Sequence, residues 1–302
     1  MRKSRPMPLW QSVPLRGVLF AAGGAATLLP RPLELRLGRA LGRLALRFGL
    51  FKSKVAEENI RRCLRGRDAA ARRRILERNF EHYGQLFFEY LHFFSPLPGH
   101  YRRYMAANSV VEGRENWEKA NARGKGVLFA ACHLGCWEML AAGGAMSGIP
   151  LTVVTTVLKP PWLDAIITER RLRTEVRAAT HPGAMPAVLR ALRRGESVAF
   201  MNDQYAPPPM GEPVYFFGIA VDTLAAVGPL AARTGAAVVP AYTYRDEEGR
   251  SHVVIEPEMT PEELAQGAAT QAISAKIEWW IRRRPEQWLW VHRRFKGAAA
   301  LA

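Results

Sequence analysis

From about residue 99 onward, short apolar runs alternate with longer amphipathic segments. The short runs are mostly apolar and continuous, as expected of buried strands, and span 127–132, 151–157 and 197–201. The longer segments between them have helical composition and span 134–146, 162–177 and 185–194. Strand and helix in turn predict an α/β fold in which helices flank a mostly parallel sheet.

The last third of the chain continues with fewer regular signals. We expect a helix at 223–233, a hairpin that pairs 237–244 with 252–256 around a turn at 246–249, and a last helix at 262–284. Pro285 ends this last helix because proline cannot continue the backbone hydrogen bonding.

The amino-terminal segment has the pattern of a membrane anchor. Its first sixteen residues carry four positive charges, and residues 17–29 carry none. As a helix the uncharged run spans about 20 Å, against about 30 Å for the hydrocarbon core of a bilayer. A cleaved signal peptide is an alternative reading. The flanking positive charge favours an uncleaved anchor at the cytoplasmic face.

The next segment is amphipathic in an unusual way. Between residues 35 and 51, arginines at 36, 39, 43 and 47 share a helix with Leu37, Leu41, Leu44 and Phe48. A cationic face beside an apolar face suits an anionic bilayer surface. A packed helix with a solvated basic face gives the same pattern, and the anchor ahead of it favours the membrane.

Two more helices are expected before the α/β region, at 55–64 and at 68–94, with Asp68 as the N-cap of the second. Prolines and a glycine at 95–99 interrupt the helical pattern. We therefore divide the chain into an anchor at 1–30, a basic helical region at 31–98 and an α/β core at 99–302.

Charge is the most unusual bulk property. The chain has 43 Lys and Arg against 27 Asp and Glu, a net charge of +16. Residues 1–106 hold 21 basic and 7 acidic side chains, so almost all of the excess lies in the first third. Nucleic acid is not the expected partner, because the basic residues follow an apolar run and no nucleic-acid-binding motif is present. An acidic partner would be attracted by this charge.

His133 follows the first buried strand, and Glu138 follows His133 by five residues. In a single helix these two side chains would lie about 140° apart, so we place His133 in the turn and Glu138 in the helix. The carboxylate could then hold one imidazole nitrogen and leave the other to accept a proton. Amide groups of the first turn, with Gly135 allowing close approach, could face an oxyanion.

Four motifs resemble one known family. They are His133-Leu-Gly-Cys-Trp-Glu138, the strand ending in Asp203-Gln204, Tyr215-Phe-Phe-Gly218 with Thr223 and Gly228-Pro229, and Pro285 to Phe295. In order and spacing they are similar to the motifs of the bacterial lipid A biosynthesis (lauroyl/myristoyl) acyltransferases, part of the wider glycerolipid acyltransferase group.

The resemblance implies an enzyme that moves an acyl chain from an acyl carrier protein thioester, or from acyl-CoA, to a hydroxyl of a membrane glycolipid at the inner membrane. It implies that His133 is the general base and that Glu138 orients it. It also implies direct attack of the hydroxyl on the thioester, without a covalent acyl-enzyme and without a cofactor.

The remaining motif residues are candidates for substrate binding: Gly135, Trp137, Arg171, Asp203, Gln204, Phe216, Phe217, Gly218 and Thr223. Arg171 is assigned by count, since the family's arginine is followed by a glycine that this chain lacks; we expect it to help stabilise the oxyanion. Asp203 and Gln204 end a strand, so we expect them on the same sheet edge as His133, where their hydrogen bonds shape the site. The aromatic pair suits an acyl chain.

Other chemistries have little support. Three cysteines in 302 residues make no disulfide framework, and Cys132, His133 and Cys136 lack a second ligand pair for zinc, so no metal is expected. No nucleophile elbow or phosphate-binding loop is present. Two alternatives remain open: an acyltransferase for another lipid, such as a lysophospholipid or a phosphoinositide mannoside, and a non-catalytic membrane-binding relative.

Overall fold

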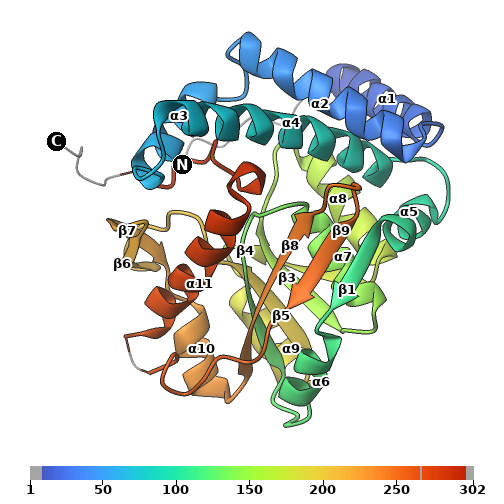
Figure 1. The fold of residues 1–302 in the computed structure, drawn as a ribbon. Coiled ribbons are helices and arrows are strands. Elements are labelled where there is room, and N and C mark those ends of the chain that lie inside the picture. The colour runs from blue at the N-terminus through green and yellow to red at the C-terminus, as the bar shows by residue number, and fades with distance from the viewer. Residues whose placement is uncertain (1–8, 266, 297–302) are drawn as a thin grey trace.

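A computed structural model of the protein describes residues 9–265 and 267–296. At its centre is a seven-stranded sheet in the order β1-β9-β8-β2-β5-β3-β4 (Figure 1). Its strands are β1 Ser109–Glu112, β2 Val127–Ala131, β3 Leu151–Thr156, β4 Val176–His181, β5 Ser197–Met201, β8 Ala237–Arg245 and β9 Ser251–Ile255. All neighbours are parallel except β8 and β9, which form the expected hairpin. The mostly parallel α/β class is confirmed.

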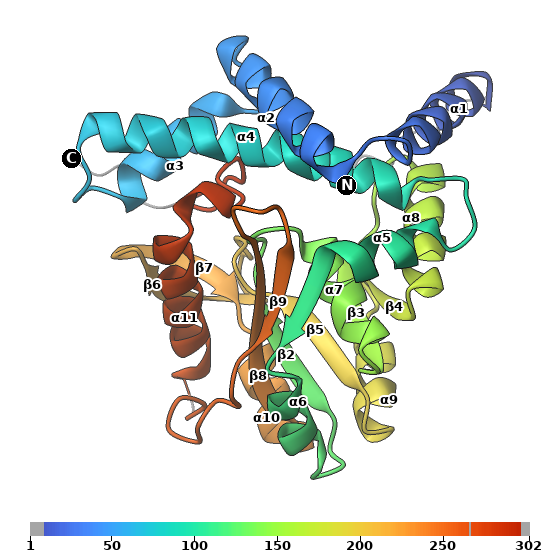
Figure 2. The ribbon, with the colours of Figure 1, turned by 45° about the vertical axis from the view of Figure 1, so that its right-hand side comes forward.

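Helices cover both faces of this sheet (Figure 2). On one face lie α6 Arg114–Asn121 and α7 Trp137–Met146, and on the other α9 Met185–Arg193, α10 Val227–Thr234 and α11 Ala269–Arg283. Strand β2 is buried on both sides, with Val127 and Phe129 in one core cluster and Leu128 and Ala130 in the other. This double burial explains why β2 is continuously apolar.

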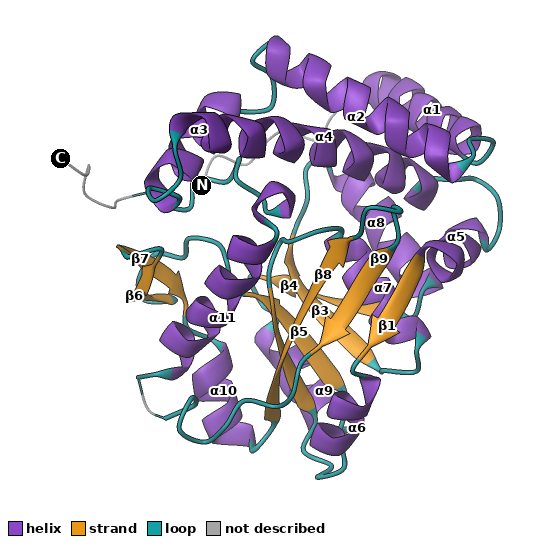
Figure 3. Ribbon diagram, viewed as in Figure 1, coloured by secondary structure: helices purple, strands orange, loops and turns teal. Residues whose placement is uncertain are grey.

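The amino-terminal helices form a layer across one end of the sheet (Figure 3). They are α1 Leu9–Ala26, α2 Arg31–Arg47, α3 Ser53–Cys63 and α4 Ala69–Phe93, and α5 His100–Asn108 leads from this layer into β1. The side chain of Asp68 caps α4 as expected, accepting a hydrogen bond from the Ala71 amide at 2.6 Å. Of the expected anchor, residues 1–8 lie outside the described residues.

Helix α1 is the described part of that anchor. Across residues 9–265 and 267–296, none of the helices combines the length and the apolar character needed to cross a bilayer.

The crossing of α2 and α4 depends on glycines. A Cβ atom at Gly42 would lie 1.9 Å from the carbonyl oxygen of Phe80, and one at Gly84 would lie 1.9 Å from that of Gly38. The two backbones are therefore in direct contact. As a result, α2 approaches α4 through its small residues. Leu35 is buried, whereas Leu33, Leu37, Leu41 and Leu44 are exposed.

Several predicted helices have different bounds in the structure, and three of them lose residues to a strand or a loop. The segment at 162–177 is α8 Pro161–Arg173 followed by strand β4, because Glu175 turns the chain with a positive φ of 66°. The helix expected at 223–233 starts only at Val227, since Thr223 and Leu224 pair in the hairpin of β6 Gly211–Phe216 and β7 Ile219–Leu224. The helix expected at 262–284 starts at Ala269. Alternation in the short β6–β7 strands is too brief to show in the sequence.

Candidate active site

His133 and Asp203 lie together at the carboxyl ends of two paired strands. Strands β2 and β5 run in parallel with Ala131 opposite Met201, so the residues that follow each strand meet at one edge of the sheet. The Nδ1 atom of His133 lies 2.8 Å from Oδ1 of Asp203. The strand order thus brings together two residues that are 70 positions apart.

The Asp203 carboxylate is buried, and three donors hold it. Its Oδ2 atom accepts from the His133 amide at 2.9 Å and from the indole N–H of Trp288 at 2.8 Å, while Oδ1 faces the His133 ring. Burial alone would raise the pKa of Asp203, but His133 and Trp288 outweigh it and lower this pKa to about 2. Asp203 is therefore ionised at neutral pH.

This ionisation fixes the tautomer of His133. An ionised carboxylate can only accept hydrogen bonds, so Nδ1 of His133 must carry the proton that points at Asp203. The other ring nitrogen, Nε2, is then free to accept a proton. The amide nitrogen of Gln204 lies 3.4 Å from both ring nitrogens, and 14% of the His133 side chain is exposed. A substrate hydroxyl could reach Nε2 from this side.

Glu138 does not hold the imidazole, and that expectation is wrong. Both of its oxygens bind Arg171, with Oε1 accepting from Nη2 at 2.6 Å and Oε2 from Nε at 3.0 Å. The pair is mostly buried between α7 and α8. Burial lowers the pKa of Arg171, but Glu138 outweighs it and the pKa is raised. Helix α7 begins at Trp137, which directs Glu138 toward α8 and leaves the imidazole to Asp203.

Gly135 lies in the turn after His133 but does not offer its amide to a substrate. Its φ is +59°, and its N–H donates to the carbonyl of Gln287 at 3.1 Å. A Cβ atom at this position would lie 2.5 Å from the carbonyl oxygen of Thr243. The glycine is needed for backbone conformation and close packing, and its amide is already bonded to Gln287.

We expect Gly135→Ala to lower the free energy of unfolding by roughly 2 kcal/mol or more, since the positive φ alone costs about 1–2 kcal/mol and the Thr243 clash adds to it. Thermal or denaturant unfolding measures this. Gly144→Ala is the matched control, because Gly144 lies in α7 without positive φ and has open space around its Cβ position. Equal stabilities of the two variants would contradict this account of the turn.

Trp137 packs beside the histidine. Its ring meets that of His133 edge to face, with centroids 5.0 Å apart, and lies 5.9 Å from the ring of Tyr90 in α4. Trp137 therefore lies between the imidazole and the amino-terminal helical layer.

The aromatic motif, Phe216 to Gly218 with Thr223, packs against the segment that carries Trp288 and Trp290. The buried Phe216 ring lies 5.7 Å from Trp288, and the Phe217 ring lies 6.2 Å from Trp290. Gly218 forms the exposed turn of the β6–β7 hairpin, with φ of +72°. Thr223 is fully buried, and its hydroxyl accepts from Arg294. The side chains of Phe216, Phe217 and Thr223 thus pack inside the protein, against the closing segment 285–295.

The closing segment 285–295 contacts the site in a way that the sequence did not reveal. Besides the bond from Trp288 to Asp203, the Leu289 amide donates to the His133 carbonyl at 3.2 Å. Asn79 of α4 donates to the Glu286 and Trp288 carbonyls, both at 2.9 Å. The motif marked this segment, but nothing in it distinguishes Trp288 from its neighbouring tryptophans.

Cysteines and acidic groups give no sign of a metal centre here. Cys63, Cys132 and Cys136 are free and buried, and burial raises the pKa of all three. In the described part of the chain, no cluster of three or more His, Cys, Asp or Glu side chains is placed to hold a metal ion.

The chain is similar to known proteins along nearly its whole length. The sequence model of the family described as "Bacterial lipid A biosynthesis acyltransferase" matches residues 16–297. A lipid A biosynthesis lauroyltransferase of Escherichia coli K12 is 30% identical over 273 residues, which are 89% of this chain and 87% of the relative. A lipid A biosynthesis palmitoleoyltransferase of the same strain is 27% identical, over 89% of this chain and 86% of that relative.

A lipid A biosynthesis acyltransferase of Haemophilus influenzae is 25% identical over 63% of this chain and 60% of its own length. Together, the α/β fold and these matches define the chain as an acyltransferase. More specifically, it belongs to the bacterial lipid A biosynthesis acyltransferase family, which confirms the resemblance of the motifs.

Proposed function

We propose that the protein is a membrane-associated O-acyltransferase that moves an acyl chain from a thioester to a hydroxyl of a lipid A precursor. The observation that carries this proposal is the His133–Asp203 pair, whose geometry leaves Nε2 of His133 free as a general base. This pair lies at the carboxyl edge of the sheet, where open α/β folds bind their ligands.

In the proposed reaction, Nε2 of His133 takes the proton of the acceptor hydroxyl while the hydroxyl oxygen attacks the thioester carbonyl carbon. The tetrahedral intermediate collapses, the C–S bond breaks, and the proton returns from His133 to the leaving thiolate. An ester and a free thiol result. Asp203 holds the ring and stabilises the imidazolium that forms between the two steps.

We assign oxyanion stabilisation to the amides of the first turn of α7, as expected from the sequence. The first amides of a helix have no partner within the helix and carry partial positive charge. We propose that Arg171 supports this turn through its two bonds to Glu138, which lies in the same turn. Gln204 and Trp137 remain proposed parts of the substrate site. The buried residues Phe216, Phe217 and Thr223 support it indirectly, by packing against segment 285–295.

An acyl carrier protein or acyl-CoA is the proposed donor. Both present the acyl group on a phosphopantetheine arm, and a carrier protein is also acidic. The net charge of +16 would speed its encounter with the enzyme by electrostatic attraction. We therefore favour the carrier protein as the donor.

The membrane surface is proposed as the place of action because one face of α2 exposes apolar side chains. Leu33, Leu37, Leu41, Leu44 and Phe48 are all exposed, and Phe51 in the following turn is 70% exposed. Because α2 approaches α4 through Gly38 and Gly42, these apolar side chains remain available to a membrane. Exposed apolar residues with arginines beside them suit insertion into an anionic leaflet. We place this leaflet at the cytoplasmic side of the inner membrane.

Phe48→Ser together with Phe51→Ser should weaken binding to vesicles of phosphatidylethanolamine and phosphatidylglycerol by about tenfold or more, because each inserted aromatic side chain contributes roughly 1.5–3 kcal/mol when fully buried. Vesicle flotation or co-sedimentation measures the effect. The matched control is Tyr215→Ser, which removes a 68% exposed ring on the β6–β7 hairpin. Unchanged binding of the Phe48/Phe51 variant, or equal loss in the control, would disprove this membrane face.

The substrate assignment is tested by offering two donors and three acceptors. Purified protein in detergent receives acyl carrier protein thioester or acyl-CoA, with a lipid A precursor, a lysophospholipid or a phosphoinositide mannoside. Mass spectrometry should find acylated lipid A precursor, formed faster with the carrier protein. If only another lipid were acylated, that lipid would be the acceptor. If no lipid were acylated, the protein would be better described as a non-catalytic, membrane-binding member of the family.

A further inference from the structure

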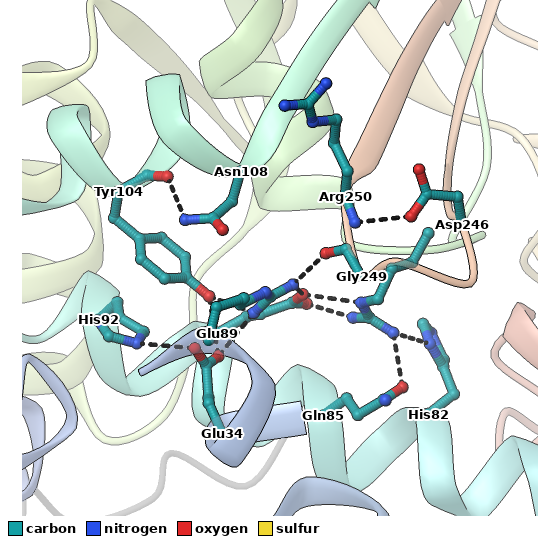
Figure 4. Close-up of polar contacts among 12 residues, drawn as sticks. Glu34, His82, Gln85, Glu89, His92, Tyr104, Asn108, Asp246, Gly249 and Arg250 are labelled. Atoms are coloured by element: carbon teal, nitrogen blue, oxygen red, sulfur yellow. Dashed lines mark hydrogen bonds and ion pairs between the residues drawn. The ribbon is translucent and has the colours of Figure 1, made fainter. Parts of the chain in front are cut away.

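A buried network of four charged side chains joins the helical layer to the core. Its members are Arg31, Glu34, Glu89 and Arg245, from α2, α4 and β8. Both glutamates are 1% exposed, and Arg245 is 5% exposed. Figure 4 shows Glu34 and Glu89 at the centre of the group, with Tyr104 on one side and His82 and Gln85 on the other.

Glu89 is shared by the two arginines. Its Oε1 atom accepts from Arg31 Nη2 at 2.6 Å and from Arg245 Nε at 2.9 Å, and its Oε2 accepts from Arg245 Nη2. Burial would raise the pKa of Glu89, but the two guanidinium groups outweigh it and lower this pKa to about 2. Arg31 also binds Glu34 at 2.7 Å, so two positive charges balance two negative ones.

The third nitrogen of the Arg245 guanidinium group, Nη1, contacts two more residues of α4. It donates to Nδ1 of His82 at 2.8 Å and to the side-chain oxygen of Gln85 at 3.0 Å. Burial and the charge of Arg245 lower the pKa of His82 to about 3, so its ring is neutral.

The backbone of Arg245 continues the connection to the active site. Its N–H donates to the Gln287 side chain at 2.7 Å, and its carbonyl accepts from the same side chain at 2.8 Å. The Gln287 carbonyl in turn accepts the Gly135 amide at 3.1 Å, two residues after His133. A continuous chain of contacts thus runs from α2 through Glu89, Arg245 and Gln287 to the turn that holds His133.

Stability alone is a weak explanation for such a network. Buried ion pairs lose most of their attraction to the cost of desolvation, and apolar residues of similar size often stabilise a protein as well or better. What the network provides is a fixed geometry, since the Arg245 fork locks β8 to α4 at two bonds. Small displacements of a reacting group are costly to turnover.

We infer that Glu89 and Arg245 are positioning residues for the His133 turn: their buried ion pair sets the place of β8 and Gln287, and through them of Gly135 and His133. This inference rests on the proposed function in taking His133 as the base. Neither residue contacts His133, and neither takes part in proton transfer.

The test uses the double variant Glu89→Gln/Arg245→Gln in the full-length protein. It removes one charge of each sign, so Arg31 and Glu34 still balance each other. We expect kcat to fall by about tenfold or more, as for a misplaced reacting group, while KM for both substrates changes by less than about twofold. Hydrogen exchange at the Gly135 amide should accelerate by about tenfold or more, because its acceptor is no longer held.

The matched control is Glu81→Gln. Glu81 also joins α2 to α4, through an exposed ion pair with Arg43 at 2.7 Å, but lies outside the network. It should leave kcat and Gly135 exchange unchanged. Arg245→Lys, which keeps the charge and loses the fork, is the milder second variant if the double variant does not fold, and should change both quantities in the same direction.

A folded double variant with wild-type turnover, or with wild-type exchange at Gly135, overturns the inference. A general acceleration of exchange across the sheet also overturns it, because the effect would then be loss of stability and not loss of position. If the wild-type protein transfers no acyl group, the proposed function fails, and the Gly135 exchange alone decides whether the ion pair positions the turn.

Discussion

Replacing His133 by alanine is expected to lower the rate of acyl transfer by between about 100- and 10,000-fold, the range that a positioned general base contributes. The acceptor hydroxyl is a poor nucleophile until it loses its proton. Among the described residues, no basic side chain other than His133 is hydrogen-bonded to Asp203 and could take that proton. Single-turnover transfer from a labelled thioester measures the loss. Binding of the protein to vesicles should be unchanged.

The fold should survive this substitution. The ring is partly exposed, and Asp203 keeps the indole N–H of Trp288 and the backbone N–H of residue 133. His181→Ala is the matched control, since His181 ends β4 at the same edge of the sheet and is exposed. If His133→Ala retained acyl transfer, or if His181→Ala lost as much, His133 would not be the base.

Asp203→Asn is expected to lower kcat by about 100-fold or more while the protein stays folded. The carboxylate accepts from three donors, whereas an amide has one accepting oxygen and presents an N–H group to the others. Nδ1 of His133 would then accept a hydrogen bond, and Nε2 would carry the proton and lose its basic role. Turnover and circular dichroism measured on the same sample separate this effect from unfolding.

Glu138 provides the comparison, because the sequence alone assigned it the role that Asp203 fills. If Glu138 acts through Arg171, then Glu138→Gln and Arg171→Gln should lower kcat to a similar extent, and the double variant should be no worse than either single variant. Asp203→Asn should instead combine multiplicatively with Arg171→Gln. Additivity between Glu138 and Arg171, together with wild-type kcat in Asp203→Asn, would restore the original assignment.

The fold and the place of the site follow from local patterns. Runs such as 127–132 are apolar because strands such as β2 are covered on both faces, and that double burial is visible in the sequence. The location of His133 and Asp203 on one edge follows from both residues ending strands of a parallel sheet. No long-range information was needed for these conclusions.

Partner choice could not be predicted, because it depends on how distant elements pack. Glu138 is five residues from His133, yet the fold pairs it with Arg171 and gives His133 to a residue 70 positions away. The contact between Arg245 and Glu89 joins residues 156 positions apart, and no periodic pattern in the sequence indicates it. The glycine crossing of α2 and α4 likewise leaves Leu37, Leu41 and Leu44 exposed, although the pattern of α2 allowed both orientations.

The most direct test of the central claim is mass spectrometry of a lipid A precursor after incubation with acyl carrier protein thioester and either wild-type protein or His133→Ala. The account predicts a precursor heavier by one acyl chain with the wild type, and no such product above background with the variant. Equal product from both proteins would contradict the assignment of His133, and no product from the wild type with this acceptor would contradict the proposed substrate.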